Sequence, residues 1–476
     1  MIFTDSVFFT FLPIVFFAYL ATRKHLTLNN LVLLVSSYIF YAHWDWRFCS
    51  LLALSSLVDF YCGNRIQNSN NRIARRRYLT VSMCVNLGIL AIFKYFDFFI
   101  ASLSIFLADF GIEYKALRLD IILPVGISFY TFQTMTYAID IYRREMRASN
   151  SLLNYLTYVS FFPQLVAGPI ERARNLLPQL ERQREISIYQ ITDGLRQILA
   201  GLFKKVVIAD NVAPMVDAIF AKPELYTSPE LLVAAWLFGV QIYCDFSGYS
   251  DIAIGTGKLF GINLMQNFRT PYFALSLSDF WRRWHISLST FFRDYLFIPL
   301  GGSQVARHKV IGNVLTVFLL SGLWHGANYT FLLWGFWHGL GLSLAIIFGW
   351  YAGYLGKWSA LFRNRVFGFI ATTLFVICGW IFFRAPDWAS IRVIYVKLMD
   401  ISTYANFGSV DFANYLVPVF AGMTIYLFDA IQVNQKHLLE VDRFAIPVRG
   451  LVYFGAMLSL FLLGSGTTTG FIYFQF

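Results

Sequence analysis

The chain has 476 residues, of which 57% are hydrophobic and 14% charged, against about 25% charged in an average soluble protein. Its 50 Phe, 27 Tyr and 12 Trp make 19% of the residues aromatic. A water-soluble fold has no interior large enough for so much apolar surface, whereas a lipid bilayer accommodates it. The composition therefore excludes a soluble enzyme, a disordered chain and a nucleic-acid-binding protein with an attached anchor.

The formal net charge of +11 would indicate an anionic partner in a soluble domain. Here the Lys and Arg residues lie in short clusters between apolar stretches, as they do in the cytoplasmic loops of membrane proteins, so we favour the positive-inside rule. The five Cys residues are odd in number, form no C-x-x-C pair and lie in apolar stretches. They predict buried free thiols, and neither a metal site nor a nucleic-acid partner is expected.

Apolar stretches follow one another from the N-terminus. The first covers 6–22, the second 26–44, and a third begins at 48–58. Arg23 and Lys24 after the first stretch place the N-terminus outside, and the arginines at 65–77 predict a cytoplasmic loop that agrees with this orientation. We expect one long tilted helix at 78–110 and a span at 121–139.

The stretch 148–170 is uncharged but contains Pro163 and the pair Gly168-Pro169, which predicts a broken or re-entrant segment. A charged segment at 171–185 is expected to be cytoplasmic or interfacial. Further apolar stretches lie at 231–244, 310–356, 366–383, 412–428 and 450–476. At about 20 residues per crossing, the sequence predicts one all-α membrane domain, residues 1–476, with roughly ten to twelve transmembrane helices.

The stretch 310–356 contains no Asp, Glu, Lys or Arg, yet it holds two histidines. Ionisable groups at membrane depth are costly and mark function by default, and an imidazole accepts protons near neutral pH. Gly326 would let a substrate approach the backbone beside His325, and Asn328 is close enough on a helix to share its face. For His325, function and simple packing against a neighbouring helix are about equally supported by the residues alone; for His338 we favour packing.

An amphipathic helix is predicted to begin at Ser276, because Ser276 and Asp279 have the S-x-x-D spacing of a capping box. Steps of three and four residues group apolar side chains on one face of this helix. The same steps place a basic, hydrogen-bonding stripe on another face, formed by Arg282, His285, Ser289 and Arg293. Such a helix either lies on anionic lipid or forms one wall of a cavity for an anionic donor, and periodicity alone favours the lipid surface.

Two carboxylates, Asp245 and Asp251, follow the apolar stretch 231–244 in the sequence DFSGYSD, which also contains Tyr249. At a membrane boundary they are able to pair with the arginines of the stripe. We favour a structural ion pair over a catalytic acid–base pair, because nothing in the sequence makes the two carboxylates face each other. No phosphate-binding Gly loop, H-E-x-x-H or G-x-S-x-G motif is present, so a serine nucleophile or a metal mechanism has no support.

Several of these stretches resemble motifs of the membrane-bound O-acyltransferases. The most specific are FWRRWHISLSTFFRDYLFIPLGG at 280–302 and LWHGANYTF at 323–331. Similar stretches are LPVGISFYTFQ at 123–133, FFPQLVAGPIER at 161–172, DFSGYSD at 245–251, WIFFRA at 380–385 and the tail FIYFQF at 471–476. The resemblance covers nearly the whole chain, with a core at 123–385 and an aromatic tail at 450–476. It is closest to the branch that acetylates bacterial polysaccharides such as alginate and peptidoglycan.

The resemblance implies a ring of transmembrane helices, with re-entrant and amphipathic pieces, around a funnel or tunnel in a bacterial inner membrane. It implies that His325 is the principal catalytic histidine and His285 the second functional one. It also implies a cytoplasmic acyl donor, most often acyl-CoA, with no permanently bound cofactor. An exported SGNH-type transferase is the implied partner, and it completes transfer to the polysaccharide.

Our main hypothesis is a transmembrane O-acetyltransferase in which His325 acts as general base on a hydroxyl that attacks acetyl-CoA. His285 and Asn328 would orient the thioester or donate to the developing oxyanion. The donor phosphates would meet the polar side chains of the predicted helix, Arg282, Arg283, Ser289 and Arg293.

Tyr473, near the end of the tail, has three open interpretations: an acyl relay, a docking point for the outer partner, or an aromatic interfacial anchor. The rival to the enzyme hypothesis is a proton-coupled transporter or flippase of an acyl donor or lipid-linked sugar, with the histidines as proton relays. A third possibility is a scaffold that only recruits an exported transferase. The residues alone favour the enzyme modestly over transport, and the resemblance favours it strongly.

Overall fold

The computed structural model describes residues 1–112, 114, 119–166, 168–351, 364–402, 404, 412–432, 435, 437–464 and 470–472. Within these ranges every regular element is helical, which confirms the predicted all-α class. The chain divides into two compact units. Unit 1 comprises Met1–Ile198 and Ile252–Met265, and unit 2 comprises Leu199–Asp251 and Gln266–Phe476.

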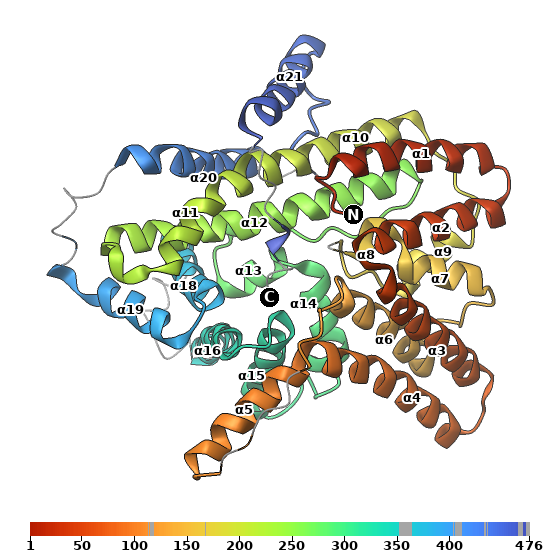
Figure 1. The fold of residues 1–476 in the computed structure, drawn as a ribbon, viewed down its shortest axis with the longest axis horizontal. Coiled ribbons are helices and arrows are strands. Elements are labelled where there is room, and N and C mark those ends of the chain that lie inside the picture. The colour runs from red at the N-terminus through yellow and green to blue at the C-terminus, as the bar shows by residue number, and fades with distance from the viewer. Residues whose placement is uncertain are drawn as a thin grey trace. The chain divides into compact units, whose positions relative to one another are not determined.

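Unit 1 begins with three helices at the predicted apolar stretches: α1 (Ser6–Thr22), α2 (Leu26–Asp45) and α3 (Cys49–Asn68). α1 packs along α2, as Figure 1 shows. The Tyr19 hydroxyl donates to the Phe260 carbonyl at 2.8 Å, so α1 is also tied to the second segment of unit 1.

A single helical run of 38 residues, Arg72–Asp109, confirms the long helix predicted at 78–110. It consists of α4 (Arg72–Leu90), a π-helical turn (Ala91–Tyr95) and α5 (Phe96–Asp109). Asn71 caps its start, because its side-chain oxygen accepts from two backbone N–H groups of the first turn. Only 6% of its most apolar window is buried, as expected of a helix that faces lipid.

α6 (Ile127–Arg143) differs in its bounds from the span predicted at 121–139. Gly126, which precedes it, has a φ of 77°, a conformation that glycine adopts without strain. A Cβ at this position would overlap the Leu165 carbonyl oxygen. The turn at Gly126 and the preceding Pro124 delay the start of the helix, which apolar composition alone did not reveal.

The segment 148–170 is broken, as its Pro and Gly residues predicted. α7 (Leu152–Ser160) is followed by the single turn of α8 (Phe162–Leu165), and α9 (Ala173–Leu180) packs on α7 and α6. The side-chain amides of Gln133 and Gln164 both donate to the Tyr158 carbonyl, at 3.1 and 2.8 Å. The protein thus satisfies a carbonyl next to the break, which a broken helix at membrane depth requires.

Two helices, α10 (Ile188–Leu202) and α12 (Ser228–Leu259), run from one unit into the other. Between them lie a π-helical turn (Phe203–Ala209) and α11 (Asp210–Ala221). α12 extends well beyond the predicted stretch 231–244, so the sequence DFSGYSD lies inside a helix. The prediction that this sequence follows a membrane span was therefore wrong. The helix continues through Asp245 and Asp251 because buried lysines neutralise their carboxylates.

The rest of unit 2 is a series of shorter elements and one helical hairpin. The short elements are α13 (Leu277–Arg283), α14 (Ile286–Phe292) and a π-helical turn (Arg293–Phe297). The hairpin consists of α15 (Arg307–His325) and α16 (Tyr329–Tyr351), and α16 packs on α18 (Arg365–Arg384). α19 (Trp388–Met399), α20 (Phe412–Gln432) and α21 (Ile446–Leu463) follow.

Six helices of the described residues are long and apolar enough to cross a membrane: Arg72–Asp109, Ser228–Leu259, Tyr329–Tyr351, Arg365–Arg384, Tyr415–Gln432 and Ile446–Leu463. α1 is equally apolar in character but has only 17 residues. These helices make the chain a multi-pass membrane protein. The total of roughly ten to twelve crossings stays a prediction.

Candidate active site

His325 is the last residue of α15, and Gly326 ends the helix in an extended conformation. A Cβ at position 326 would overlap the Phe331 ring, so packing explains the glycine. The approach of a substrate to the Gly326 backbone stays a prediction. His325 is buried, and the aromatic rings around it, with centroids 4.8–5.3 Å away, are those of Trp324, Trp334 and Phe383.

The predicted amphipathic helix starts where expected but does not run through. Ser276 caps α13, and its Oγ accepts from the Asp279 N–H at 3.2 Å. The helix then breaks between α13 and α14. The predicted continuous stripe is wrong, because His285 lies at the break and is only 1% exposed, whereas Arg282 and Arg293 are exposed.

His285 has a φ of 42°, which places it in the left-handed region. Side chains other than Asn, Asp and His are rare there. Two backbone hydrogen bonds fix the break on either side of it: the Ile286 N–H donates to the Asn267 carbonyl at 2.8 Å, and the Arg269 N–H donates to the Arg283 carbonyl at 2.9 Å. The segment 267–269 thereby takes over backbone groups that a continuous helix would have paired internally.

The two buried histidines lie next to each other, with ring centroids 6.4 Å apart. Trp324 contacts both, at 5.9 Å from the His285 ring and 4.9 Å from the His325 ring. Burial lowers the pKa of His285 to about 3, so this imidazole is neutral at physiological pH. Hydrogen bonds of about 3 Å from each ring would reach one small group placed between them.

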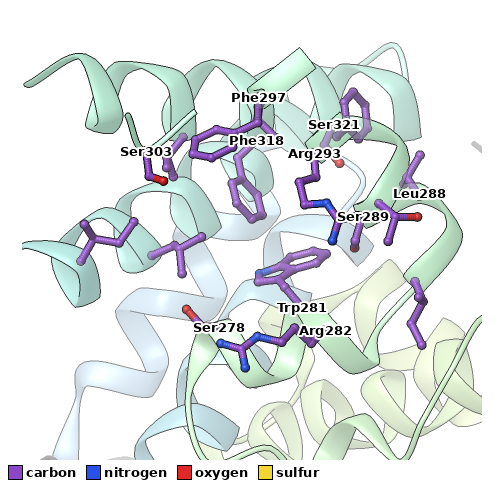
Figure 2. A pocket seen from close by; sticks show the side chains of 17 residues that line it. Ser278, Trp281, Arg282, Leu288, Ser289, Arg293, Phe297, Ser303, Phe318 and Ser321 are labelled. Atoms are coloured by element: carbon purple, nitrogen blue, oxygen red, sulfur yellow. The ribbon is translucent and has the colours of Figure 1, made fainter. Parts of the chain in front are cut away.

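A cavity of about 740 Å³ opens beside the elements that carry the two histidines. Trp281, four residues before His285, and Ser321, four residues before His325, both line it. Its polar lining consists of Ser278, Arg282, Ser289, Thr290, Arg293, Ser303 and Ser321, and its aromatic lining of Trp281, Phe292, Phe297 and Phe318. Figure 2 shows Arg282 and Arg293 on opposite sides of the Trp281 ring. The cavity thus combines positive charge with apolar walls.

Two of the predicted donor-binding residues are not part of this lining. The Arg283 Nε donates to the Asp279 carboxylate at 2.9 Å, one turn away on α13. Asn328 does not share a helix with His325, because α15 ends there; its side-chain oxygen accepts from the Thr330 N–H at 3.0 Å at the start of α16. The predicted shared helix face was therefore wrong.

The carboxylates of α12 form ion pairs, but with lysines of the preceding π-helical turn and not with the arginines of the predicted stripe. The Lys205 ammonium lies 2.5 Å from Asp245 and 2.8 Å from Asp210, and Lys204 lies 2.9 Å from Asp251. All of these side chains are buried. Since a buried charge requires a partner, these pairs hold the π-helical turn, α11 and α12 together.

Two residues near the end of the aromatic tail, Phe471 and Ile472, pack on the same part of α12. The Ile472 N–H donates to the Asp245 carboxylate at 2.8 Å, and the Phe471 ring lies 4.4 Å from the Tyr249 ring. Tyr249, Phe471 and Ile472 are all buried. Tyr473, the predicted relay or docking residue, lies outside the described residues.

Comparison with known proteins assigns the chain to a family. The sequence profile described as MBOAT, membrane-bound O-acyltransferase family, matches residues 142–385. The chain is 35% identical, over the full length of both proteins, to the probable alginate O-acetylase AlgI of Pseudomonas putida. The chain belongs to the membrane-bound O-acyltransferase family.

Two further relatives are named for other acceptors. The peptidoglycan O-acetyltransferase of Helicobacter pylori is 35% identical over 81% of this chain and 77% of its own length. The teichoic acid D-alanyltransferase of Bacillus subtilis is 28% identical over 42% of this chain and 53% of its own length. As a membrane-bound O-acyltransferase, the chain is a multi-pass membrane acyltransferase, and the matched region contains both histidines.

Three buried residues in this part of unit 2 were missed from the sequence. Lys204 and Lys205 gave a signal, because two adjacent cations in an apolar stretch need buried anions, and the same unit supplies Asp245 and Asp251. Asn267 gave none. It lies in an irregular segment between helices and reaches His285 only through the fold.

Proposed function

We propose that this membrane-bound O-acyltransferase is an O-acetyltransferase that takes acetyl groups from acetyl-CoA in the cytoplasm for the O-acetylation of an extracytoplasmic polysaccharide. The observation that carries the proposal is the pair of buried imidazoles, 6.4 Å apart, beside a cavity that contains two arginines. The relatives named as alginate and peptidoglycan acetylating enzymes support acetyl as the group and a polysaccharide as the acceptor class.

In this reaction His325 is the general base. It removes the proton from an acceptor hydroxyl as the oxygen attacks the thioester carbonyl. The C–O bond forms, the C–S bond breaks, and the proton held by the imidazole passes to the departing thiolate of coenzyme A. Burial among aromatic rings supports this role, because these side chains keep bulk water away from the reacting groups. His285 contacts Trp324, as His325 does, and it orients the reacting groups.

The donor enters the cavity with its phosphates toward Arg282 and Arg293. Guanidinium groups form charge-assisted hydrogen bonds with phosphate oxygens. The aromatic walls suit the less polar pantetheine arm, and Ser289 adds a hydroxyl to the lining. No permanently bound cofactor is required for this transfer.

The first acceptor in this proposal is a protein hydroxyl, either Tyr473 or a residue of an exported SGNH-type partner, which then passes the acetyl group to the sugar. Tyr473 is the candidate within this chain, and the two residues that precede it in the sequence, Phe471 and Ile472, are buried on α12. The Phe471 ring lies 5.7 Å from the ring of Phe246, which itself lies 4.6 Å from His285.

We place the enzyme in the bacterial inner membrane with its N-terminus outside. The arginines at 72–77 lie in the first turns of one long helical run, and Arg143 and Arg144 lie at the end of the next long helix, α6. One crossing by the helical run and a return by α6 put both clusters on the cytoplasmic side. The donor and these loops then share one compartment.

The test uses purified protein and acetyl-CoA labelled in the acetyl group. The wild-type chain should cleave the thioester or form acetyl-protein, and His325→Gln should lower the rate by about 10²- to 10⁴-fold, the usual contribution of a general base. His308→Gln, an exposed histidine at the start of the same helix, is the matched control and should be unaffected. Thermal unfolding in detergent confirms that both variants are folded.

Normal thioester cleavage by a folded His325→Gln protein would refute the assignment of the base. Movement of labelled donor across proteoliposomes, without cleavage by the wild-type chain, would instead favour a transporter.

A further inference from the structure

The second histidine has a hydrogen-bond partner that belongs to no motif. Asn267 precedes α13, and its side-chain oxygen lies 3.1 Å from the Nδ1 of His285. The same oxygen accepts from the Ser287 Oγ at 2.9 Å and from the Ser287 backbone N–H at 3.3 Å. Asn267 is 1% exposed, so these bonds form away from bulk water.

These contacts fix which atom of the Asn267 amide faces His285. A backbone N–H only donates, so the atom that the Ser287 N–H contacts is the amide oxygen and not the nitrogen. The other end of the amide agrees, because its Nδ2 donates to the Ser250 Oγ of α12 at 3.2 Å. An amide oxygen only accepts, and therefore the Nδ1 of His285 is the atom that carries the proton.

We propose that Asn267 is a positioning residue that holds His285 in the Nδ1–H tautomer and leaves its Nε2 as a hydrogen-bond and proton acceptor in the active site. The inference rests on the proposed acetyl transfer for its catalytic meaning, whereas the tautomer itself is a property of the resting protein.

The tautomer decides what His285 does beside His325. A neutral imidazole carries one N–H. When His285 uses its Nδ1–H to donate to Asn267, its Nε2 has no proton to donate to a developing oxyanion. His285 therefore accepts a proton or a hydrogen bond from a reacting group, and the oxyanion is stabilised by another donor. In the part of the chain that the structure describes, the rings of Phe246, Phe268, Trp324 and His325 lie around His285, so a second titratable imidazole faces it.

The tautomer is measured directly by solid-state NMR of the full chain with ¹⁵N-labelled histidine in lipid. Protonated and bare imidazole nitrogens differ widely in chemical shift, and subtracting the spectrum of His285→Gln assigns the signal among the seven histidines. We expect a protonated Nδ1 and a bare Nε2 for His285. A protonated Nε2 with a bare Nδ1 would overturn the proposal, whether or not the protein transfers acetyl groups.

Variants of Asn267 test the consequence for catalysis. Asn267→Leu keeps the size and removes the acceptor, so kcat should fall by about 10- to 100-fold, as for other residues that orient a functional histidine, with little change in KM for the donor. Asn267→Asp keeps an acceptor and should restore most of kcat. Its carboxylate favours the protonated imidazole, so the acid limb of the kcat/KM profile should move to higher pH.

Asn364→Asp is the matched control, since Asn364 caps α18 through its side-chain oxygen and Asp caps equally well. It should change neither kcat nor the pH profile. A role of Asn267 in folding alone predicts a lower unfolding temperature and an unshifted acid limb in Asn267→Asp, and that result would also overturn the proposal. If the wild-type chain does not cleave acetyl-CoA, the proposed function fails while the NMR result still decides the tautomer.

Discussion

His285 adopts a left-handed backbone conformation, which costs an L-residue about 1–2 kcal/mol. Such strain persists only where the surrounding structure over-determines it. Here the backbone hydrogen bonds made by the Ile286 N–H and by the Arg283 carbonyl hold the chain on both sides of His285. The His285 side chain between them is buried. In a continuous helix the same histidine would lie on a stripe with the exposed Arg282. The break thus converts a surface position into one that faces His325.

The arginines of the cavity make a testable contribution to donor binding. If Arg282 and Arg293 contact phosphates, replacing either with Gln should raise KM for acetyl-CoA by about tenfold or more, because a hydrogen bond to a charged group contributes about 1.5–3 kcal/mol. kcat at saturating donor should change little, since the arginines lie away from the thioester. Initial rates over a range of acetyl-CoA concentrations measure both constants.

Acetyl-pantetheine, which carries no phosphate, provides the control for this prediction. Its KM should be the same for wild type, Arg282→Gln and Arg293→Gln, and Arg365→Gln, an exposed arginine on α18, should change neither donor. Equal losses with both donors would mean that the arginines shape the cavity and do not bind phosphate.

At the scale of elements, the apolar stretches located most helices, and their ends were the main errors. The bounds of α1 were predicted residue for residue, because charged residues lie directly before and after its uncharged sequence. α6 starts late because of the turn at Gly126, and α12 continues past 244 because Asp245 and Asp251 are neutralised by lysines distant in sequence. Hydrophobic periodicity reveals neither turn geometry nor long-range ion pairs. It also does not reveal the break at His285, which depends on backbone hydrogen bonds to the segment 267–269.

The hairpin of α15 and α16 depends on a close approach of backbones. A Cβ at Gly322 would overlap the Phe331 carbonyl, and a Cβ at Gly335 would overlap the Phe318 carbonyl. Gly322→Ala should therefore destabilise the protein by about 1–3 kcal/mol, the usual effect of overpacking. It should also displace His325, which ends the same helix. The thermal unfolding midpoint in detergent and the rate of acetyl-CoA cleavage measure these effects.

Gly312 on the same helix is the matched control. A Cβ there meets nothing within 4 Å. Gly312→Ala should leave activity unchanged and stabilise the helix by up to about 1 kcal/mol, because Ala has the higher helix propensity. Similar unfolding midpoints for the two variants would show that the glycines are not required for the hairpin to close.

For the molecule as a whole, the net charge of +11 has two separate uses. Lys204 and Lys205 are buried in unit 2, where they neutralise carboxylates of α11 and α12. The arginines at 72–77 and at 143–147 lie at helix ends in unit 1. This second group, together with Arg23 and Lys24 after α1, favours the orientation that keeps these helix ends in the cytoplasm.

That orientation is testable with single cysteines in a chain whose five native Cys residues are replaced by Ala. Asn70, Ile112 and Asn150 are exposed and lie, in turn, between α3 and α4, after α5 and between α6 and α7. Ile112→Cys should react with a membrane-impermeant maleimide in intact spheroplasts. Asn70→Cys and Asn150→Cys should react only after permeabilisation, because the arginine clusters beside them stay in the cytoplasm.

The alternation of the three sites separates the possible topologies. If the run Arg72–Asp109 turned back within the membrane, Asn70→Cys and Ile112→Cys would label alike, whereas a single crossing separates them. If the whole chain were inverted, Asn70→Cys and Asn150→Cys would label in intact spheroplasts and Ile112→Cys would not. That pattern would contradict the positive-inside assignment and would place the loops of unit 1 on the side opposite to the proposed cytoplasmic donor.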